Sequence, residues 1–570
     1  MKHVLMFSVF LLTLVIFTFV AGVPAQAQDI SGDWQGTLSA GGAELRLVLH
    51  LTKSADGTFT ATLDSVDQGT NGIPVNSVSL NDSKLSLGID AVHGTYEGKV
   101  AADGKSISGT WSQGSALPLE FKRAVPVKTE HKPAQPSDID GAWMGSLEMG
   151  AIRLRVVFHI VNTDDGLITT MDSPDQNQNG VPTTATKRDG ASLKIEMKAI
   201  GGIFEGKIAA DRQSIDGTFT QLGSPHDLLL KRVKDKAELE LKRPQNPVKP
   251  YPYREEEVSY ENKLQNVTLA ATLTIPPGKG PFPSVVLITG SGPQDRDESL
   301  LGHKPFLVLS DYLTRHGIVV LRADDRGTGK STGDFSTATT ADFATDTEAG
   351  IAYLKTRPEV DPHKIGLIGH SEGGVIAPMI AARNKDIAFI VMMAGTGVPG
   401  DQILVAQTQA IEIASGKTPE EAAKDGNKER EVLSLVETEK NNAVLEKELK
   451  QKLTGEVAEA QIGMQIKQIT SPWFRFFLTY DPATALRKVT CPVLALSGAL
   501  DTQVPPKVNL PAIRKALEEG GNKHFEVDEL PGLNHLLQTA KTGAPAEYAE
   551  IEETMSPVAL DKISTWILKQ

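Results

Sequence analysis

The stretch KIGLIGHSEGGVIAPMIAA, residues 364–382, decides the fold of the second half of the chain. Residues 365–368 form a short apolar run typical of a buried strand, and residues 374–382 are apolar over the length of a helix. Between them lies GHSEG, which fits the pattern G-x-S-x-G. In a strand–turn–helix of this kind the glycines allow a tight turn that exposes the serine hydroxyl. We therefore predict Ser371 as a nucleophile, with an ordinary strand–helix turn as the alternative.

A second G-x-S-x-G lies in LRADDRGTGKSTGDF, residues 321–335, around Ser331. A strand precedes this serine, but the residues after it have the composition of a loop rather than a helix. The GKS inside this stretch resembles a phosphate-binding loop, which would need a glycine where Asp324 stands. We therefore expect neither a nucleotide site nor a nucleophile here, and we expect Asp325 and Arg326 to brace the sheet edge near the active site.

A serine nucleophile requires a base, usually histidine, and a carboxylate that orients it. Where the serine lies on such a turn, the acid and then the histidine follow it along the chain. His524 precedes a strand, at the wrong edge of the sheet, whereas His535 lies in a loop after the last strand. We predict His535 as the base and Asp501, just past the strand 493–496, as the acid. A solvent-facing loop histidine and a helix-capping aspartate are the alternatives.

A tetrahedral intermediate also needs two backbone N–H donors for its oxyanion. The residue after the nucleophile, Glu372, supplies one. The loop after the first central strand supplies the other, and there Gly290 and Gly292 allow a tight turn. We predict the Ser291 N–H as this second donor, with a plain glycine-rich turn as the alternative.

From residue 254 onward, apolar strands alternate with helices, which predicts a parallel sheet covered on both faces. Residues 401–468 are charged and helical in period, so we expect a helical cap inserted at about residues 400–482. Four aromatic residues near the end of the cap predict an acyl pocket or, equally, the packing of the cap. They are Trp473, Phe474, Phe476 and Phe477.

Residues from about 256 to 570 resemble α/β-hydrolases of the serine aminopeptidase-like, esterase group. The resemblance rests on LITGSGP (287–293), DRGTGKS (325–331), GHSEG (369–373), SGALD (497–501) and LNH (533–535). It implies the α/β-hydrolase fold and a Ser-Asp-His triad, and the group includes carboxylesterases, lipases, peptidases and deacetylases. The usual His-Gly of the oxyanion loop is replaced here by Thr289-Gly290, which weakens the assignment of the donor.

An internal repeat dominates the first half of the chain. The matching segments lie 108 or 109 residues apart, as from Tyr96 to Phe204 and from Trp34 to Trp143. Apolar and polar residues alternate in residues 45–51 and 154–160, and Asn-Gly and Asp-Gly pairs separate such runs. We predict two tandem all-β modules, each a barrel or a sandwich, followed by the α/β-hydrolase domain with its cap.

The predicted boundaries are a signal peptide at 1–27, β modules at 28–125 and 139–234, proline-rich linkers at 126–138 and 235–253, and the hydrolase domain at 254–570. Lys2 and His3 precede an apolar run, and Ala25-Gln-Ala27 offers a cleavage site. We expect export to the periplasm or the outside, with no stable membrane span after cleavage. An uncleaved membrane anchor is the alternative.

The formal net charge of −13 disfavours nucleic acid and anionic membranes as partners. The only cysteine, Cys491, allows no internal disulfide, and we expect no metal and no cofactor. The predicted function is a secreted serine hydrolase that cleaves small carboxylic, short-chain acyl esters through an acyl-enzyme. One alternative is a serine peptidase of the aminopeptidase or prolyl type. Another is that the β modules bind glycan, lipid or protein. Trp34, Trp111 and Trp143 are candidate aromatics for this, but a role in the core is favoured for them, because Gly-x-Trp at a strand start usually packs inward.

Overall fold

The structure is a computed structural model that divides into two compact units, Met1–Glu130 and His131–Gln570. It describes residues 29–40, 43–54, 58–65, 70–81, 83–89, 92, 94–113, 115–123, 134–149, 152–176, 178–221, 223–235, 239, 242–453 and 459–570. The predicted signal peptide and most of the linker 126–138 lie outside these residues. Within the described residues, no helix is long and apolar enough to cross a membrane.

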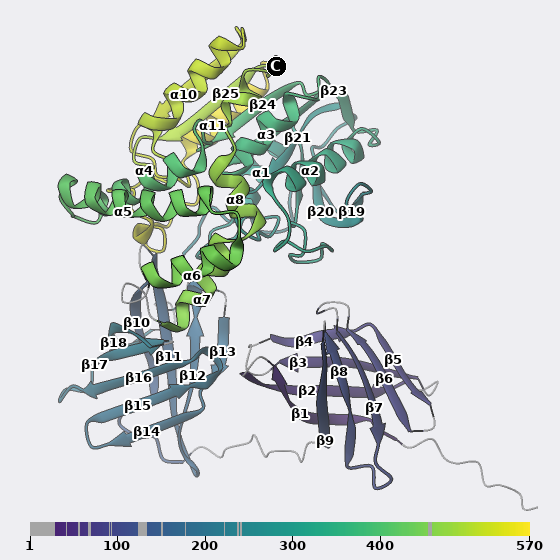
Figure 1. Ribbon diagram of the computed structural model, residues 1–570, viewed down its shortest axis with the longest axis vertical. Helices are drawn as coiled ribbons and strands as arrows, with labels where there is room; N and C mark the ends of the chain where they lie inside the picture. Colours follow the sequence, from purple (N-terminus) through teal and green to yellow (C-terminus); the bar gives the residue numbers. More distant parts are fainter. Residues whose placement is uncertain are drawn as a thin grey trace, which may run out of the picture. The chain divides into compact units, whose positions relative to one another are not determined.

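The first unit contains one antiparallel sheet of nine strands, ordered β4-β3-β2-β1-β9-β8-β7-β6-β5 (Figure 1). The strands are β1 (Gly32–Ala40), β2 (Ala43–Lys53), β3 (Phe59–Ser65), β4 (Thr70–Val75), β5 (Ser77–Asn81), β6 (Lys84–Ile89), β7 (Gly94–Val100), β8 (Ser106–Gln113) and β9 (Ser115–Arg123). The edge strands are consecutive in the chain, and β4 contacts β6 while β3 contacts β5. The sheet is therefore a single, nearly closed barrel rather than a sandwich.

The inside of this barrel is filled with apolar side chains, because strand residues alternate between its two faces. Trp34 is fully buried, donates its indole N–H to the Ile30 carbonyl at 2.9 Å, and lies under the guanidinium of Arg123. Trp111 is buried in the same core. These tryptophans stabilise the barrel and are not exposed platforms for a ligand.

A second nine-stranded sheet opens the second unit, ordered β13-β12-β11-β10-β18-β17-β16-β15-β14. Its strands are β10 (Gly141–Met149), β11 (Ile152–Thr163), β12 (Gly166–Ser173), β13 (Gln178–Pro182), β14 (Ala185–Asp189), β15 (Ser192–Met197), β16 (Gly202–Ile208), β17 (Ser214–Gln221) and β18 (Ser224–Arg232). Short 3-10 helices η3 (Pro174–Gln176) and η4 (Lys198–Ile200) join some of them. Trp143 is buried and bonded to the Ile139 carbonyl at 2.8 Å, as Trp34 is to Ile30 in the first sheet.

The C-terminal α/β domain is built on an eight-stranded sheet, ordered β19-β20-β22-β21-β23-β24-β25-β26 (Figure 1). The strands are β19 (Arg254–Asn262), β20 (Val267–Ile275), β21 (Phe282–Ile288), β22 (Val319–Ala323), β23 (Val360–His370), β24 (Phe389–Met393), β25 (Val493–Gly498) and β26 (Phe525–Leu530). The strands from β22 to β26 are parallel, but β19 and β20 form an antiparallel hairpin, and β20 pairs antiparallel with β22. The expectation of a purely parallel sheet was wrong at this edge, because a short turn joins the hairpin and no helix intervenes.

Helices cover both faces of this sheet. On one face α1 (Pro305–Arg315) and α11 (Pro557–Ile567) pack on one apolar cluster. On the other face α2 (Thr340–Leu354), α3 (Gly373–Ala381) and α10 (Pro506–Glu519) pack on another. The 3-10 helix η6 (Pro545–Glu547) lies in the segment before α11. Each strand between the two layers is buried on both sides, so its residues read as a continuous apolar run.

The cap is inserted between β24 and β25, and its described residues form helices joined by short turns, with no strand. Its helices are α4 (Gly400–Ala414), α5 (Pro419–Thr438), α6 (Asn442–Leu453), α7 (Glu459–Ile469), α8 (Pro472–Thr479) and the short α9 (Ala483–Leu486). The cap has an apolar cluster of its own, to which α4, α5, α6, α7 and α8 all contribute. It is thus a small packed layer rather than a loose insertion.

Candidate active site

Ser371 lies on the tight turn between β23 and α3, with a φ of 53°. Such a left-handed backbone is unfavourable for a residue with a side chain, so the surrounding structure has to hold it. The Ser371 N–H donates to the Met393 carbonyl at 2.9 Å. A Cβ on Gly369 would lie 1.9 Å from the Gly373 carbonyl oxygen, and one on Gly373 would lie 2.2 Å from that of Ile288. Only glycine fits at both positions, and their close contacts set the turn.

Asp501 and His535 meet at the same edge of the sheet. Asp501 follows β25, His535 follows β26, and parallel strands end on one side of a sheet. The Nδ1 of His535 lies 2.9 Å from Oδ2 of Asp501, and both side chains are buried. The other oxygen of Asp501 accepts the backbone N–H groups of Gln503 and Val504 at 2.9 and 2.8 Å. The aspartate therefore caps the turn before α10 and also orients the histidine ring through its contact with Nδ1.

His535 lies against the turn that carries Ser371. The Nε2 of His370, the residue before Ser371, lies 3.1 Å from the His535 carbonyl oxygen, and the two imidazole rings are 4.9 Å apart. Within the described residues no hydrogen bond joins Ser371 Oγ to His535 Nε2. In enzymes without substrate such bonds are often long and tighten only when the substrate binds.

The loop after β21 comes close to Ser371. A Cβ built on Gly290 would lie 3.4 Å from the Ser371 Cβ. The Gly290 N–H is occupied by Oε1 of Glu298 at 2.8 Å, whereas the N–H groups of Ser291 and Glu372 have no partner among the described residues. The two N–H groups predicted to bind the oxyanion are thus unpaired among the described residues, one directly after Gly290 and one directly after Ser371.

The side chain of Glu372 joins the nucleophile turn to two helices. Its Oε1 accepts the Thr340 hydroxyl at 2.6 Å and the indole N–H of Trp473, on cap helix α8, at 2.8 Å. Burial raises the pKa of Glu372, and these two hydrogen bonds offset only part of the increase. A single carboxyl group therefore couples the position of the cap to the backbone N–H beside the nucleophile.

The four cap aromatics divide into two sets. Phe474 is buried in the apolar cluster of the cap itself, with Trp473 packed against it. Phe476 and Phe477 line a pocket that also contains Glu372 and Thr340, with a cavity volume of ≈ 10 Å³. That is the space of about one water molecule, so an acyl chain would have to displace side chains there. The acyl pocket stays a prediction for these two residues.

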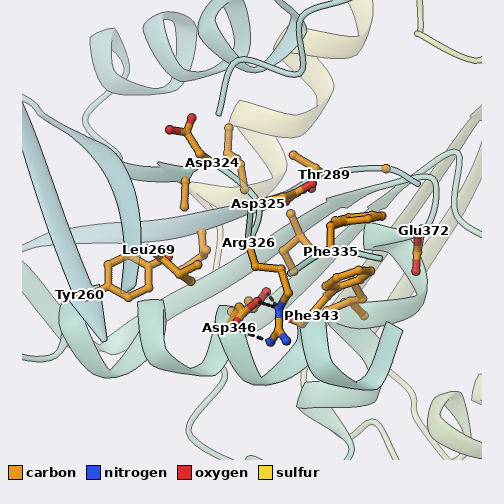
Figure 2. Close-up of a pocket in the computed structure, with 17 residues that line it drawn as sticks. Tyr260, Leu269, Thr289, Asp324, Asp325, Arg326, Phe335, Phe343, Asp346 and Glu372 are labelled. Carbon is orange, nitrogen blue, oxygen red and sulfur yellow. Dashed lines mark hydrogen bonds and ion pairs between the residues drawn. The ribbon is translucent and has the colours of Figure 1, made fainter. Parts of the chain in front are cut away.

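A second pocket, of ≈ 40 Å³, lies beneath the nucleophile turn and is lined by residues such as Thr289, Asp325 and Glu372. Figure 2 shows Phe335 and Phe343, whose rings stack at 4.8 Å, on the side of Glu372. Asp325 accepts the Thr289 hydroxyl at 2.8 Å and the Gln294 N–H at 2.9 Å. This aspartate therefore braces the two loops that meet beside the serine.

The rest of the loop after β22 also has a bracing role. Arg326 forms a two-point ion pair with Asp346 of α2 (Figure 2). The Ser331 hydroxyl donates to the Asp324 carbonyl at 2.8 Å and accepts the Ala270 N–H at 2.9 Å. Both of its hydrogen-bonding roles are used and the side chain is buried, so this serine ties β20 to the loop.

Two side chains near the site carry no recognisable sequence signal. Glu298 and His370 are 72 residues apart, and His370 Nδ1 lies 2.9 Å from Glu298 Oε1. The pattern G-x-S-x-G accepts any residue at the position of His370, and nothing in the spacing of the loop after β21 points to Glu298.

Comparison with known proteins adds a family and relatives. Residues 265–520 match the model of the family described as X-Pro dipeptidyl-peptidase (S15 family). This range includes Ser371 and Asp501 but not His535. Esterase EstD of Thermotoga maritima is 28% identical over 316 residues, which cover 55% of this chain and 68% of the esterase. An uncharacterised 31.7 kDa protein of Escherichia coli is 24% identical over 265 residues, covering 45% of this chain and 86% of that protein.

Two solved structures also match the chain. The Pyrococcus furiosus esterase Pf2001 has 16% sequence identity and a TM-score of 0.35, and the match covers 58% of this chain and 98% of that one. Est1E from Butyrivibrio proteoclasticus, solved with ferulic acid bound, has 19% identity and a TM-score of 0.33, with 55% and 98% covered.

The family match and the EstD homology fall on the same part of the chain as the parallel sheet, and Ser371 lies on its strand–turn–helix. The C-terminal part of this chain is therefore a serine hydrolase of the α/β-hydrolase type.

Proposed function

We propose that the protein hydrolyses carboxylic esters with short acyl chains, using Ser371 as nucleophile, His535 as base and Asp501 as the orienting acid. The observation that carries the proposal is the 2.9 Å contact between His535 Nδ1 and Asp501, at the sheet edge where Ser371 stands on its left-handed turn. The similarity to Esterase EstD favours an ester substrate. The apolar run and cleavage motif in residues 1–27 favour export, so we expect the exported protein to begin near Gln28.

The proposed reaction has two halves. Ser371 Oγ attacks the acyl carbon while His535 Nε2 takes its proton, and the N–H groups of Ser291 and Glu372 bind the oxyanion. His535 then gives the proton to the leaving alkoxide, and the alcohol departs from the acyl-enzyme. In the second half water attacks the acyl carbon, His535 takes a proton from that water, and Ser371 leaves with this proton as the acid is released.

Replacing the nucleophile tests the proposal directly. Ser371→Ala should lower kcat for p-nitrophenyl acetate and butyrate by at least about 10³-fold, because no other group can form the acyl-enzyme. Ser331→Ala is the matched control, since it lies in the other G-x-S-x-G and its hydroxyl is already bonded within the fold. Full turnover by Ser371→Ala would exclude this mechanism.

A peptidase on the same residues is the second candidate, and the match to the X-Pro dipeptidyl-peptidase family favours it. Both chemistries use the same nucleophile, so the leaving group discriminates between them. We expect kcat/KM for p-nitrophenyl butyrate to exceed that for aminoacyl-prolyl and aminoacyl p-nitroanilides. A higher kcat/KM on the anilides would reverse this order.

A further inference from the structure

Glu298 and His370 connect two loops, and the proposed mechanism requires that the position of one loop relative to the other is fixed. Oε1 of Glu298 accepts the Gly290 N–H at 2.8 Å, next to the proposed donor Ser291. The same oxygen lies 2.9 Å from His370 Nδ1, and His370 Nε2 lies 3.1 Å from the His535 carbonyl oxygen. A continuous hydrogen-bonded chain therefore runs from the oxyanion loop to the backbone of the proposed base.

The partners of His370 indicate its charge. One ring nitrogen faces a carboxylate oxygen and the other faces a carbonyl oxygen, and both oxygens are acceptors. A neutral imidazole has a single N–H and can satisfy only one of them, whereas an imidazolium donates to both. Glu298 and His370 are both buried, and a buried charge needs a close counter-charge. The pair therefore fits a buried imidazolium–carboxylate ion pair.

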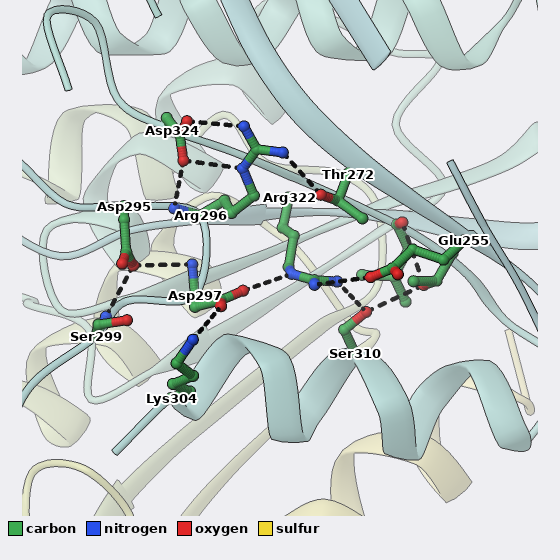
Figure 3. Close-up of polar contacts among 12 residues, drawn as sticks. Glu255, Thr272, Asp295, Arg296, Asp297, Ser299, Lys304, Ser310, Arg322 and Asp324 are labelled. Atoms are coloured by element: carbon green, nitrogen blue, oxygen red, sulfur yellow. Dashed lines mark hydrogen bonds and ion pairs between the residues drawn. The ribbon is translucent and has the colours of Figure 1, made fainter. Parts of the chain in front are cut away.

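The backbone around Glu298 is held in place by other ion pairs. Arg296 makes two hydrogen bonds to Asp324, at 2.9 and 2.8 Å, and Arg322 donates to Asp297 at 2.9 Å (Figure 3). Glu298 itself has a φ of 54°, in the left-handed region. Its second oxygen, Oε2, is buried without a hydrogen-bond partner among the described residues. A strained backbone and an unpaired buried oxygen are costly, and such costs cluster at functional sites.

We propose that Glu298 and His370 are a pair of positioning residues that fix the oxyanion loop and the His535 loop relative to Ser371. The assignment rests on the proposed function, because it gives roles to Ser291 and His535. Neither side chain needs to touch the substrate. Glu298 orients the turn that presents the Ser291 N–H, and charged His370 holds the main chain of the base.

The pair predicts how activity depends on pH. Burial lowers the pKa of His370. Three groups raise it: Glu298 through its charge and hydrogen bond, the His535 carbonyl, and Asp501 through its charge. The net pKa lies above the usual value for histidine. The titratable imidazole of His535, whose ring lies 4.9 Å from that of His370, also faces it. With a raised pKa, the imidazolium and its two hydrogen bonds persist above the pH at which an ordinary histidine loses its proton, and they are lost as the pH rises through that pKa. The alkaline limb of kcat should then report the loss of the His370 proton.

Glu298→Gln tests the role of the charge. Glutamine can still accept the Gly290 N–H but cannot stabilise an imidazolium, so His370 should lose its proton at a lower pH. We expect kcat for p-nitrophenyl butyrate at about pH 8 to fall roughly tenfold with KM changed less than about threefold, and the alkaline limb to move down by about one pH unit or more. A merely structural loss would lower kcat equally at every pH.

Glu257→Gln is the matched control, because Glu257 bonds Arg296 and Thr272 in the same region without contacting Gly290 or His370. It should keep the wild-type kcat and pH profile. A direct measurement needs no stable Glu298 variant. In the wild-type protein with ¹⁵N-labelled histidine, NMR at about pH 6.5, the ordinary pKa of histidine, should show both ring nitrogens of His370 protonated. The His370 signal can be assigned by its loss in His370→Asn.

A His370 ring with one proton at that pH, or a Glu298→Gln variant with wild-type kcat and alkaline limb, would overturn the proposal. Ser371→Ala distinguishes a failure of the positioning role from a failure of the proposed function. If Ser371→Ala is inactive while Glu298→Gln behaves as wild type, only the positioning role fails. If Ser371→Ala remains active, the proposed function fails, and the role of the pair fails with it.

Discussion

The carboxyl group of Asp325 is partly buried beside the turn that carries Ser371, and no cation among the described residues bonds to it. Burial raises its pKa most, the hydrogen bonds from Gln294 and Thr289 lower it, and the charges of Glu372 and Glu298 raise it again, to about 8. In the folded protein this group therefore keeps its proton over a pH range in which the unfolded chain has lost it. Because the folded state binds more protons there, stability falls as pH rises from about 4 to about 8 and is constant above that.

Asp325→Asn should remove this pH dependence. Asparagine is neutral and of the same shape, and it can accept the Gln294 N–H while its amide donates to the Thr289 hydroxyl. Relative to wild type, the variant should gain stability as the pH rises. The gain should be larger near pH 8.5 than near pH 5.5 by on the order of 3 kcal/mol, at about 1.4 kcal/mol for each pKa unit. Thermal melting by calorimetry at both pH values measures the difference.

Asp386 provides the control for this pH comparison. It is exposed, and the hydrogen bond from Lys355 lowers its pKa, so it stays ionised over the whole range. Asp386→Asn should therefore shift the melting midpoint equally at both pH values. The same behaviour in Asp325→Asn would show that Asp325 is ionised in the folded protein.

At the scale of elements, prediction from sequence succeeds where local pattern decides the structure. The strand and helix on either side of Ser371 were predictable because an apolar strand, two close glycines and an apolar helix follow each other directly. The ends of parallel strands likewise bring Asp501 and His535 to one edge. Strand β19 (REEEVSYEN) was not predictable, because an exposed edge strand does not read as an apolar run. The contact of Glu298 with His370 depends on the packing of two loops and leaves no periodic signal.

The roles of the aromatic residues of α8 likewise could not be predicted from the sequence alone. Composition predicts a group of aromatics near the site, but only the helix geometry separates them. Phe474 and Leu478, four positions apart, face the interior of the cap. Phe477 stacks on Trp473 at 5.4 Å, and the Trp473 indole reaches Glu372. The element thus uses one face to pack the cap and another to contact the nucleophile turn.

Trp473→Phe should weaken the link between the cap and this turn. The substitution keeps an aromatic ring but removes the donor, and leaving a buried acceptor without one of its hydrogen bonds costs about 1–3 kcal/mol. We expect kcat/KM for p-nitrophenyl butyrate to fall roughly tenfold and the preference between acetate and butyrate esters to change, because the cap then shifts relative to Glu372. Steady-state kinetics on the two esters measure both effects.

Thr340→Val is the matched comparison, since it removes the other donor to Oε1 of Glu372 and leaves the cap bonded. It should lower kcat/KM without changing the acyl preference. Identical changes in the two variants would mean that the hydrogen bonding of Glu372 matters and that the position of the cap does not.

At the scale of the whole molecule, the second β sheet contacts the loop that carries the proposed base. Leu154 of β11 packs against the apolar group of Leu301, Leu536 and Tyr548, and Leu536 is the residue after His535. The linker adds Arg243, which donates to the carbonyls of Leu301 and Ala549 at 2.8 and 3.0 Å. The proline-rich segment is therefore bound along the α/β domain rather than extended into solvent.

Leu154→Asp tests whether this contact supports catalysis. A carboxylate placed against these apolar side chains has no partner, so the contact should open. The loop that carries His535 should then lose its apolar contact with the β sheet. We expect kcat/KM to fall about three- to tenfold, equivalent to about 1 kcal/mol, and trypsin to cleave after Lys242 faster than in the wild type. Val161→Asp is the matched control, because Val161 lies on the same strand and is 46% exposed. If Leu154→Asp accelerates cleavage but leaves kcat/KM at the wild-type value, the sheet is attached to the hydrolase without acting on its active site.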